Sequence, residues 1–263
     1  MVDALFEALG GDRYLPGDTA RGPWSKDSLH GGPVAALLAG AAEGLLDGLH
    51  PARVTVELLR PVPVAPLTVS TREVRPGRKV RLVGADVATE DGTVVATATV
   101  LGIRLADVVV PESRPVSPPP GPDTVEPALR GGVAVRDDYD AFHNKGVEHR
   151  FAVGSFAAKG PSTDWIRLAV PVVAGVEPSP LQRVMGAADF SNGVSHMADF
   201  EDMLFINPDL TVHLHRLPAG EWVCLDAESR YEPHGVGLAQ SALWDEHGLL
   251  GRALQSLLVE ARS

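Results

Sequence analysis

The chain has 263 residues, 44% of them hydrophobic and 22% charged, a composition typical of a packed globular protein with one large or two modest domains. The net charge of −11 disfavours nucleic acid as a partner, because neutralising phosphates requires a basic face. No apolar run reaches membrane-spanning length, the first residues lack a signal-peptide pattern, and the single cysteine, Cys224, excludes an internal disulfide. We therefore expect a cytoplasmic protein that binds neither nucleic acid nor membranes.

The first strong element is a helix that opens with His30-Gly31-Gly32-Pro33 and continues through a small, apolar segment at 34–49. Proline is favoured in a first helical turn, and the two glycines allow another backbone to approach closely. The helix has no carboxylate between Gly31 and Ala42, so it cannot supply a catalytic base from its middle.

Four strands are expected after this helix, because the sequence alternates, is rich in Val and Thr, and is broken by turn residues. They span 53–60, 67–74, 79–88 and 93–104. A proline-rich segment at 107–140 then resembles a semi-rigid linker, with prolines at 111, 115, 118, 119, 120, 122 and 127.

The second half is expected to contain the same elements. A strand pair at 147–156 and 165–171 precedes a helix at 181–203, and strands follow at 210–216, 222–230, 236–245 and 249–259. The strand pair has only weak counterparts in the first half, at 12–15 and 20–24.

The two halves match without gaps at a spacing of 156 residues. For example, Arg60 in the first half matches Arg216 in the second, and Leu101 matches Leu257. Such self-similarity indicates a duplicated unit. One long helix on a curved antiparallel sheet in each copy is an α+β pattern. We predict an N-terminal unit at 1–106, a linker at 107–140 and a C-terminal unit at 141–263.

The segments around the expected helices and strands carry a resemblance. The chain has a His-Gly-Gly helix start, Gly-Ala-Ala-Asp-Phe at 186–190, Asn-Pro-Asp-Leu-Thr-Val-His-Leu-His-Arg at 207–216, Glu-Trp at 221–222 and Gln-Ser at 255–256. It resembles the hotdog fold, and the doubled arrangement resembles the acyl-CoA thioesterase II family of double-hotdog enzymes. In that family an Asp at the start of the second helix, a Thr or similar residue and a Gln orient a water.

The resemblance assigns these three catalytic roles to Asp189, Asn207 and Gln255. Asn207 stands where the family pattern has Thr, but an amide both donates and accepts hydrogen bonds. At a helix N-terminus, Asp189 would be held ionised and could take a proton from water. At a spacing of 156 residues, the first-copy equivalents of these positions are Pro33, Pro51 and Thr99. The two prolines cannot act in this way, so the sequence assigns the site to the second copy.

Each candidate also has a structural interpretation. Asp189 is a good helix cap, Asn207 before Pro208 is a usual turn residue, and Gln255 could lie on a solvent face. His30 is expected to fix the loop before the glycines. His213 and His215 lack a third ligand at a suitable spacing, so we expect no metal site. We also expect no cofactor, because coenzyme A would be part of the substrate.

Coenzyme A carries phosphates, and the densest basic cluster surrounds the turn at 76–77. Its members are candidate phosphate contacts or an ordinary charged hairpin tip: Arg72, Arg75, Arg78, Lys79 and Arg81. Arg60 and Arg216 recur at the same repeat position, which favours a structural role for both.

The resemblance implies a hydrolase of fatty acid metabolism that splits a fatty acyl-CoA into free acid and coenzyme A and assembles into a homo-oligomer. Two alternatives remain. One is a hotdog enoyl-CoA hydratase, which Asn207-Pro208-Asp209 resembles superficially, although the residues that follow are typical of a strand. The other is a non-catalytic acyl-CoA-binding or assembly subunit.

Overall fold

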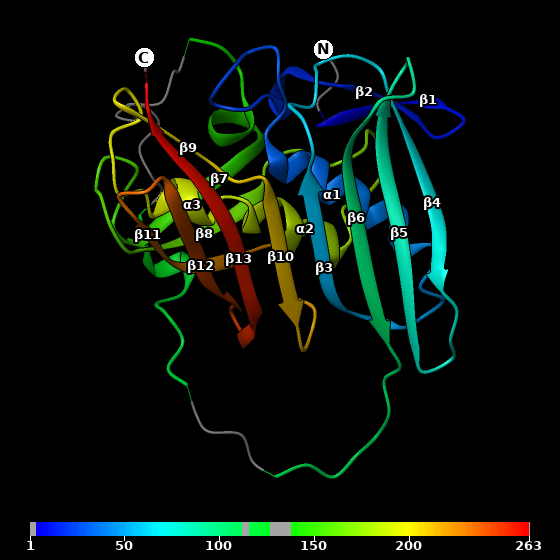
Figure 1. The fold of residues 1–263 in the computed structure, drawn as a ribbon. Coiled ribbons are helices and arrows are strands. Elements are labelled where there is room, and N and C mark those ends of the chain that lie inside the picture. The colour runs from blue at the N-terminus through cyan, green and yellow to red at the C-terminus, as the bar shows by residue number, and fades with distance from the viewer. Residues whose placement is uncertain (1–3, 112–115, 127–137, 263) are drawn as a thin grey trace.

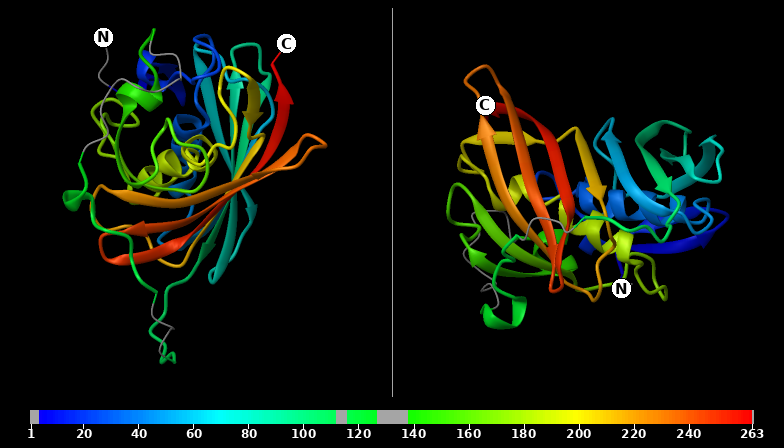
Figure 2. Two further views of the ribbon diagram at one scale, coloured as in Figure 1. Left: turned by 90° about the vertical axis from the view of Figure 1, so that its left-hand side faces the viewer. Right: turned by 90° about the horizontal axis from the view of Figure 1, so that it is seen from below.

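The computed structural model describes residues 4–111, 116–126 and 138–262. In these ranges one continuous antiparallel sheet carries the helices on a single, concave side (Figures 1 and 2). Its strand order is β1-β2-β4-β5-β6-β3-β10-β13-β12-β11-β8-β7, with β9 paired to β13. The two halves of the chain meet where β3 pairs with β10, so the sheet has no break between the copies.

The strands of the first half are β1 (Phe6–Gly10), β2 (Arg13–Pro16), β3 (His50–Leu58), β4 (Leu67–Arg75), β5 (Val80–Thr89) and β6 (Val94–Ile103). Those of the second are β7 (Val147–Val153), β8 (Ser162–Leu168), β9 (Met203–Ile206), β10 (Asp209–Leu214), β11 (Val223–Tyr231), β12 (Val236–Asp245) and β13 (Gly248–Ala261). The helices are α1 (Gly31–Glu43), α2 (Pro180–Ala188) and α3 (Ser191–Val194).

The sheet follows the sequence repeat closely. The bounds of β4 and β5, moved by 156 residues, are the bounds of β11 and β12, and β6 falls within β13. Alternating buried and exposed positions, as in β13, explain why the period of two was visible in the sequence. The prediction of an α+β fold is confirmed. The expected strand at 20–24 was wrong, and β1 and β9 were missed because both are short.

The helices do not follow the same spacing. α1 begins after His30 and α2 after Ser179, so the two N-caps are 149 residues apart. In this alignment the first-copy counterpart of Asp189 is Gly40, and the predicted equivalence with Pro33 was wrong. Insertions between helix and sheet are tolerated in loops, whereas a shift within the sheet would turn side chains to the wrong face.

The long helix expected at 181–203 was also wrong. α2 ends at Ala188, and only the short α3 follows before β9. The Ser191 hydroxyl donates to the carbonyl of Ala188 at 2.8 Å, while Asn192 donates through its side chain to the carbonyl of Phe205. Such short polar side chains compete with helical hydrogen bonds, and here they connect the segment to the sheet.

α1 and α2 pack directly against each other, and the glycines make this possible. A β-carbon on Gly32 would stand 2.7 Å from the carbonyl oxygen of Gly186, well inside contact distance. One apolar cluster then extends across both copies, from Leu38 and Val54 in the first to Leu181 and Leu225 in the second. The shared core holds the ends of the helices in fixed positions relative to each other.

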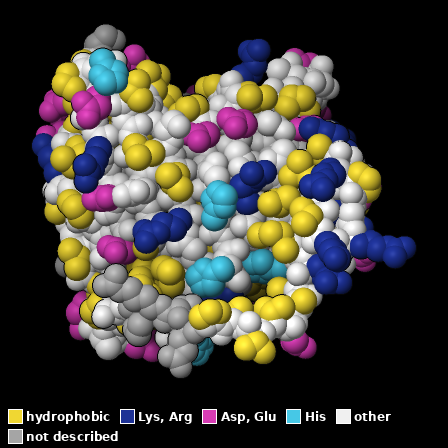
Figure 3. All heavy atoms as spheres, turned by 60° about the horizontal axis from the view of Figure 1, so that its bottom comes forward, with side chains coloured by type: hydrophobic (Ala, Val, Ile, Leu, Met, Phe, Trp, Pro, Cys, Tyr) yellow, Lys and Arg dark blue, Asp and Glu magenta, His cyan; other side chains and the backbone are white. Residues whose placement is uncertain are grey.

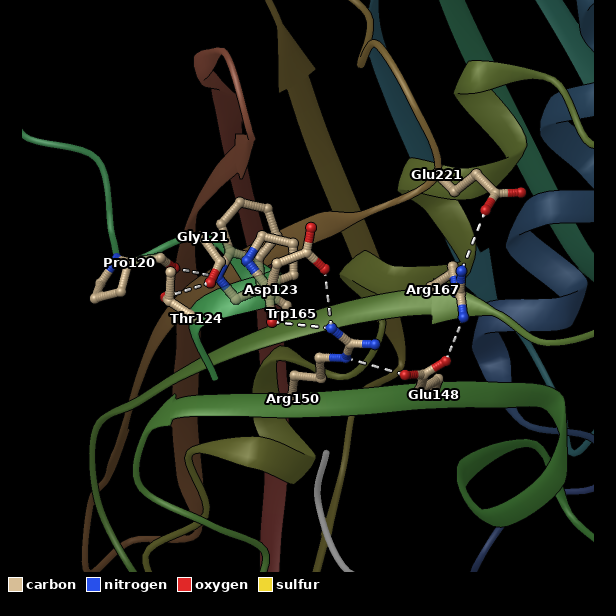
Figure 4. Close-up of polar contacts among 10 residues, drawn as sticks. Pro120, Gly121, Asp123, Thr124, Glu148, Arg150, Trp165, Arg167 and Glu221 are labelled. Atoms are coloured by element: carbon tan, nitrogen blue, oxygen red, sulfur yellow. Dashed lines mark hydrogen bonds and ion pairs between the residues drawn. The ribbon is translucent and has the colours of Figure 1, made fainter. Parts of the chain in front are cut away.

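Part of the proline-rich segment is bound to the outer surface of β7 and β8 (Figure 4). The Trp165 indole donates to the carbonyl of Pro120 at 2.7 Å, and the Arg150 guanidinium donates to the carbonyl of Pro122 at 3.0 Å. Arg150 and Arg167 both pair with Glu148. The prolines at 115 and 127 lie outside the described residues.

The half-buried Arg216 and the buried Asp245 form a bidentate ion pair that fixes the turn after β10. Nη1 and Nη2 of the Arg216 guanidinium donate to the two carboxylate oxygens at 2.7 and 2.5 Å, and the backbone amides of Ala219 and His247 donate to the carboxylate at 2.9 and 2.8 Å. Burial alone would raise the pKa of Asp245, but Arg216 and the two amides together hold this pKa below its usual value. The resulting stabilisation is present above the unfolded pKa of about 3.9 and is lost as the pH falls through the folded pKa.

We therefore expect Asp245→Asn to lower the free energy of unfolding by about 2 kcal/mol at neutral pH, because hydrogen bonds to a charged group are lost. The loss should shrink toward zero as the pH falls below the folded pKa. Urea unfolding at several pH values measures it. Asp199→Asn, which breaks an exposed pair with Lys159, is the control and should change stability by less than about 0.5 kcal/mol. A loss that does not vary with pH would contradict the assignment.

Candidate active site

Asp189 lies at the C-terminal end of α2, where it is the C-cap, and not at the start of a helix as predicted. Its carboxylate nevertheless faces a helix N-terminus, that of α1 in the other copy. A β-carbon on Gly31 would stand 2.6 Å from Asp189 Oδ2. The partial positive charge expected at this carboxylate therefore comes from the first half of the chain.

The structure brings Asp189, Asn207 and Gln255 together from three different elements. Asn207 Nδ2 donates to Asp189 Oδ1 at 2.8 Å, and Gln255 Nε2 donates to the same oxygen at 3.1 Å. Asp189 is 6% exposed and Gln255 is fully buried. The two amides fix one oxygen of a buried carboxylate and leave the other oxygen toward α1.

The two amides differ in what they can still bind. Gln255 donates a second bond to the carbonyl of Asp189 at 3.2 Å, and its oxygen accepts from the amide of Asn192 at 3.0 Å. Its donors are thus used within the protein, so it positions Asp189. Asn207 donates its second bond to the carbonyl of Asp209 at 3.2 Å. Within the described residues its side-chain oxygen accepts no bond, which leaves it for a water.

His30 is the N-cap of α1, as its predicted role in fixing the loop before the glycines requires, and it also contacts Asp189. Its Nδ1 lies 2.9 Å from Asp189 Oδ2 and 3.1 Å from the amide nitrogen of Gly32. The ring donates to the carboxylate only when Nδ1 carries a proton and accepts from Gly32 only when it does not, so the two contacts belong to different protonation states. Phe190 and Phe142 pack against the imidazole, with ring centroids 4.7 and 5.2 Å away.

A cavity of about 470 Å³ opens beside these groups. Its polar end contains His30, Gly31, Asp189 and Asn207. Its other walls are mainly aromatic and aliphatic and come from both halves of the chain: Trp24, Leu29, Val34, Leu58, Val62, Phe156, Phe190, Phe200, Leu204, Phe205 and Ile206. An apolar cavity with a few convergent polar groups is the usual form of a small-molecule site.

Family models match both halves of the chain. The acyl-CoA thioesterase N-terminal domain matches residues 20–102, and the acyl-CoA thioesterase C-terminal domain matches residues 111–259.

The chain belongs to the acyl-CoA thioesterase family.

Solved structures of the same shape include the acyl-CoA thioesterase II TesB2 from Mycobacterium marinum, with a TM-score of 0.65, 18% identity and coverage of 99% of this chain and 97% of that one. The tesB protein of Mycobacterium avium subsp. paratuberculosis gives a TM-score of 0.68 at 17% identity, covering 97% and 95%. A conserved protein with a hotdog fold from Alicyclobacillus acidocaldarius gives 0.70 at 19%, covering 100% and 97%. A search of curated proteins finds no match. The double-hotdog fold expected from the sequence is thereby confirmed.

The basic cluster around the turn at 76–77 lies far from the cavity of this thioesterase-family chain. That turn joins β4 to β5 at the lower end of the sheet (Figure 1), where β5 begins. The cavity wall at Leu58 lies across β6 from Val87, near the other end of β5. Figure 3 shows Lys and Arg side chains gathered at this lower edge. Arg72 pairs with Asp86, and Arg81 pairs with Glu73. Of the predicted contacts, Arg72, Arg75, Arg78 and Lys79, none lines the cavity.

Three other expectations concern groups outside the cavity. Cys224 is buried, and burial raises the pKa of its thiol, as expected of a structural cysteine. His213 is exposed on β10. Among the described residues no group of three metal-ligating side chains is found, and no helix there is long and apolar enough to cross a membrane.

Proposed function

We propose that this chain hydrolyses a fatty acyl-CoA to the free acid and coenzyme A, with a water activated by Asp189. The observation that supports the proposal is the asymmetric environment of this carboxylate. Oδ1 accepts from two amides, which occupies both of its lone pairs, whereas Oδ2 has His30 as its side-chain neighbour. One acceptor site of Oδ2 therefore remains for a water in the cavity.

The chemistry follows from these positions. A water that donates one hydrogen to Asp189 Oδ2 and the other to the side-chain oxygen of Asn207 presents its lone pair to the thioester carbonyl carbon. As the C–O bond forms, Asp189 takes the proton, and negative charge develops on the carbonyl oxygen. The amide of Gly31, at the positive end of α1, is the proposed donor to that oxygen. Collapse breaks the C–S bond, and the proton leaves with the coenzyme A thiol.

The rest of the cavity supports an acyl substrate. Its aromatic and aliphatic walls offer a fatty chain an apolar environment, and burial of each methylene contributes about 0.8 kcal/mol to binding. The hydratase alternative is favoured by one observation, the close His30–Asp189 pair, which could serve as an acid and a base. Asp209, in contrast, lies at the start of β10 and accepts from the amide of Ser256 at 2.7 Å.

An assay with acyl-CoA esters from acetyl to palmitoyl tests the function, with enoyl-CoA esters in parallel. Release of free thiol in proportion to enzyme supports the proposal. Loss of enoyl absorbance without thiol release would establish the hydratase instead. Tight binding of acyl-CoA without either reaction would establish a binding subunit.

We also propose that the chain forms at least a homodimer in the cytoplasm. The proposal rests on the family resemblance alone. The two copies within one chain already pair through β3 and β10, so the fold itself does not require a second chain. Light scattering at micromolar concentration should give at least twice the chain mass of 27.8 kDa. A mass equal to that of one chain would show that the duplicated pair is sufficient.

A further inference from the structure

Arg60 and Arg216 occupy the same position in the repeat but have different surroundings. Arg216 is committed to its fork with Asp245, the last residue of β12. The last residue of β5 is Thr89, which carries no charge. Within the described part of the chain Arg60 forms no ion pair, and its side chain makes no hydrogen bond. The sequence favoured a structural role for both arginines, but only Arg216 has a side-chain partner among the described residues.

Arg60 is placed at the wall of the cavity. It is exposed and lies just after β3, and its backbone amide and that of Leu59 both donate to the carbonyl of Val95, at 3.2 and 3.0 Å. The amide of Leu58 donates to the carbonyl of Pro208 at 2.7 Å. Because Pro208 follows Asn207, these backbone hydrogen bonds fix the main chain at Arg60 relative to the proposed water-binding site.

A second cation, Lys26, lies in a loop that borders the cavity, although Lys26 itself is not one of the lining residues. Lys26 is exposed in the loop at 22–29, most of which lines the cavity. The amide of Val64 donates to the carbonyl of Asp27 at 3.2 Å, which joins this loop to the segment after Arg60. Like Arg60, Lys26 has no ion pair among the described residues. Asp27 is the neighbouring carboxylate and is also exposed.

We propose that Arg60, assisted by Lys26, binds the phosphates of coenzyme A at the cavity and that the hairpin cluster at 72–81 does not. The proposal rests on the proposed function, which requires an acyl-CoA substrate. A chain with a net charge of −11 repels a polyanion, so entry to the site requires local positive charge. A guanidinium fork matches the geometry of phosphate oxygens, and an arginine without a carboxylate partner is available for them.

The test compares Arg60→Gln with Arg78→Gln, a matched change of an exposed arginine in the hairpin cluster. Two substrates are used with the full chain, an acyl-CoA and the same acyl group as an N-acetylcysteamine thioester, which has no phosphates. We expect Arg60→Gln to raise KM for the acyl-CoA about tenfold with little change in kcat, and to leave the truncated thioester unaffected. Calorimetry should show a similar loss of affinity for free coenzyme A. Arg78→Gln should match the unchanged protein in all three measurements.

Unchanged KM and unchanged coenzyme A affinity in Arg60→Gln would overturn the proposal, as would an equal loss in Arg78→Gln. A similar loss with both substrates would also overturn it, because the arginine would then act on the acyl group or the fold. Failure of the proposed function is distinguishable from these outcomes: no thiol would be released from either thioester, whereas calorimetry would still measure the contribution of Arg60 to coenzyme A binding.

Discussion

Asp189→Asn should reduce kcat for thioester hydrolysis by on the order of a hundredfold or more, because the variant has no carboxylate to take a proton from water. The fold should survive the change. The new amide has the same shape, its oxygen can still accept from Asn207 and Gln255, and its NH₂ group can donate to an unprotonated Nδ1 of His30. Steady-state thiol release gives kcat, and thermal unfolding shows whether the variant is folded.

The stability measurement makes this prediction specific. A folded Asp189→Asn protein that retains near-normal kcat would exclude Asp189 as the base. A variant with a much lower melting temperature would not decide the question alone, so Asp189→Glu is the companion change. It keeps the carboxylate but moves it by about one methylene, and it should recover stability less well than Asn while retaining some pH-dependent activity. Activity no higher than that of Asp189→Asn would contradict the role of the carboxylate.

Gly31→Ala should lower kcat by about a hundredfold without adding or removing any polar group. The added β-carbon would stand 2.6 Å from Asp189 Oδ2, 2.9 Å from Oδ1 and 3.0 Å from Cγ, so the carboxylate must move. A displacement of about 1 Å at a catalytic group can cost a factor of about a hundred. The change requires no unusual backbone conformation, since Gly31 lies in the first turn of α1.

Gly193→Ala is the matched control for this prediction. Gly193 also lines the cavity, but a β-carbon there would have no atom within 4 Å. Its kcat should remain within about twofold of the unchanged protein, and both variants are to be compared by thiol release and thermal unfolding. Equal activity of Gly31→Ala and Gly193→Ala would show that the carboxylate tolerates displacement and that its close approach to α1 is not required for turnover.

The sequence by itself determined the elements whose signal is local. The alternation in β12 and β13 and the spacing of 156 residues defined most of the sheet, because side chains in a strand must face the core at every second position. The resemblance pointed to Asp189, Asn207 and Gln255, and the structure places them in contact. The glycines at 31 and 32 indicated a close approach of two segments before the partner segment could be known.

Only the tertiary structure decided how these groups work together. The second helix breaks at Asp189 because short polar side chains after it bond to the ends of α2 and to the sheet, which no helical periodicity records. The positive helix end that faces Asp189 and the imidazole beside it come from Gly31 and His30, which precede Asp189 by 158 and 159 residues in the chain (189 − 31 and 189 − 30). Likewise, Arg60 and Arg216 are identical in the repeat and differ only in whether a carboxylate stands opposite. Charge interactions fall off with distance in space and not along the chain, so their partners are defined only when the sheet has formed.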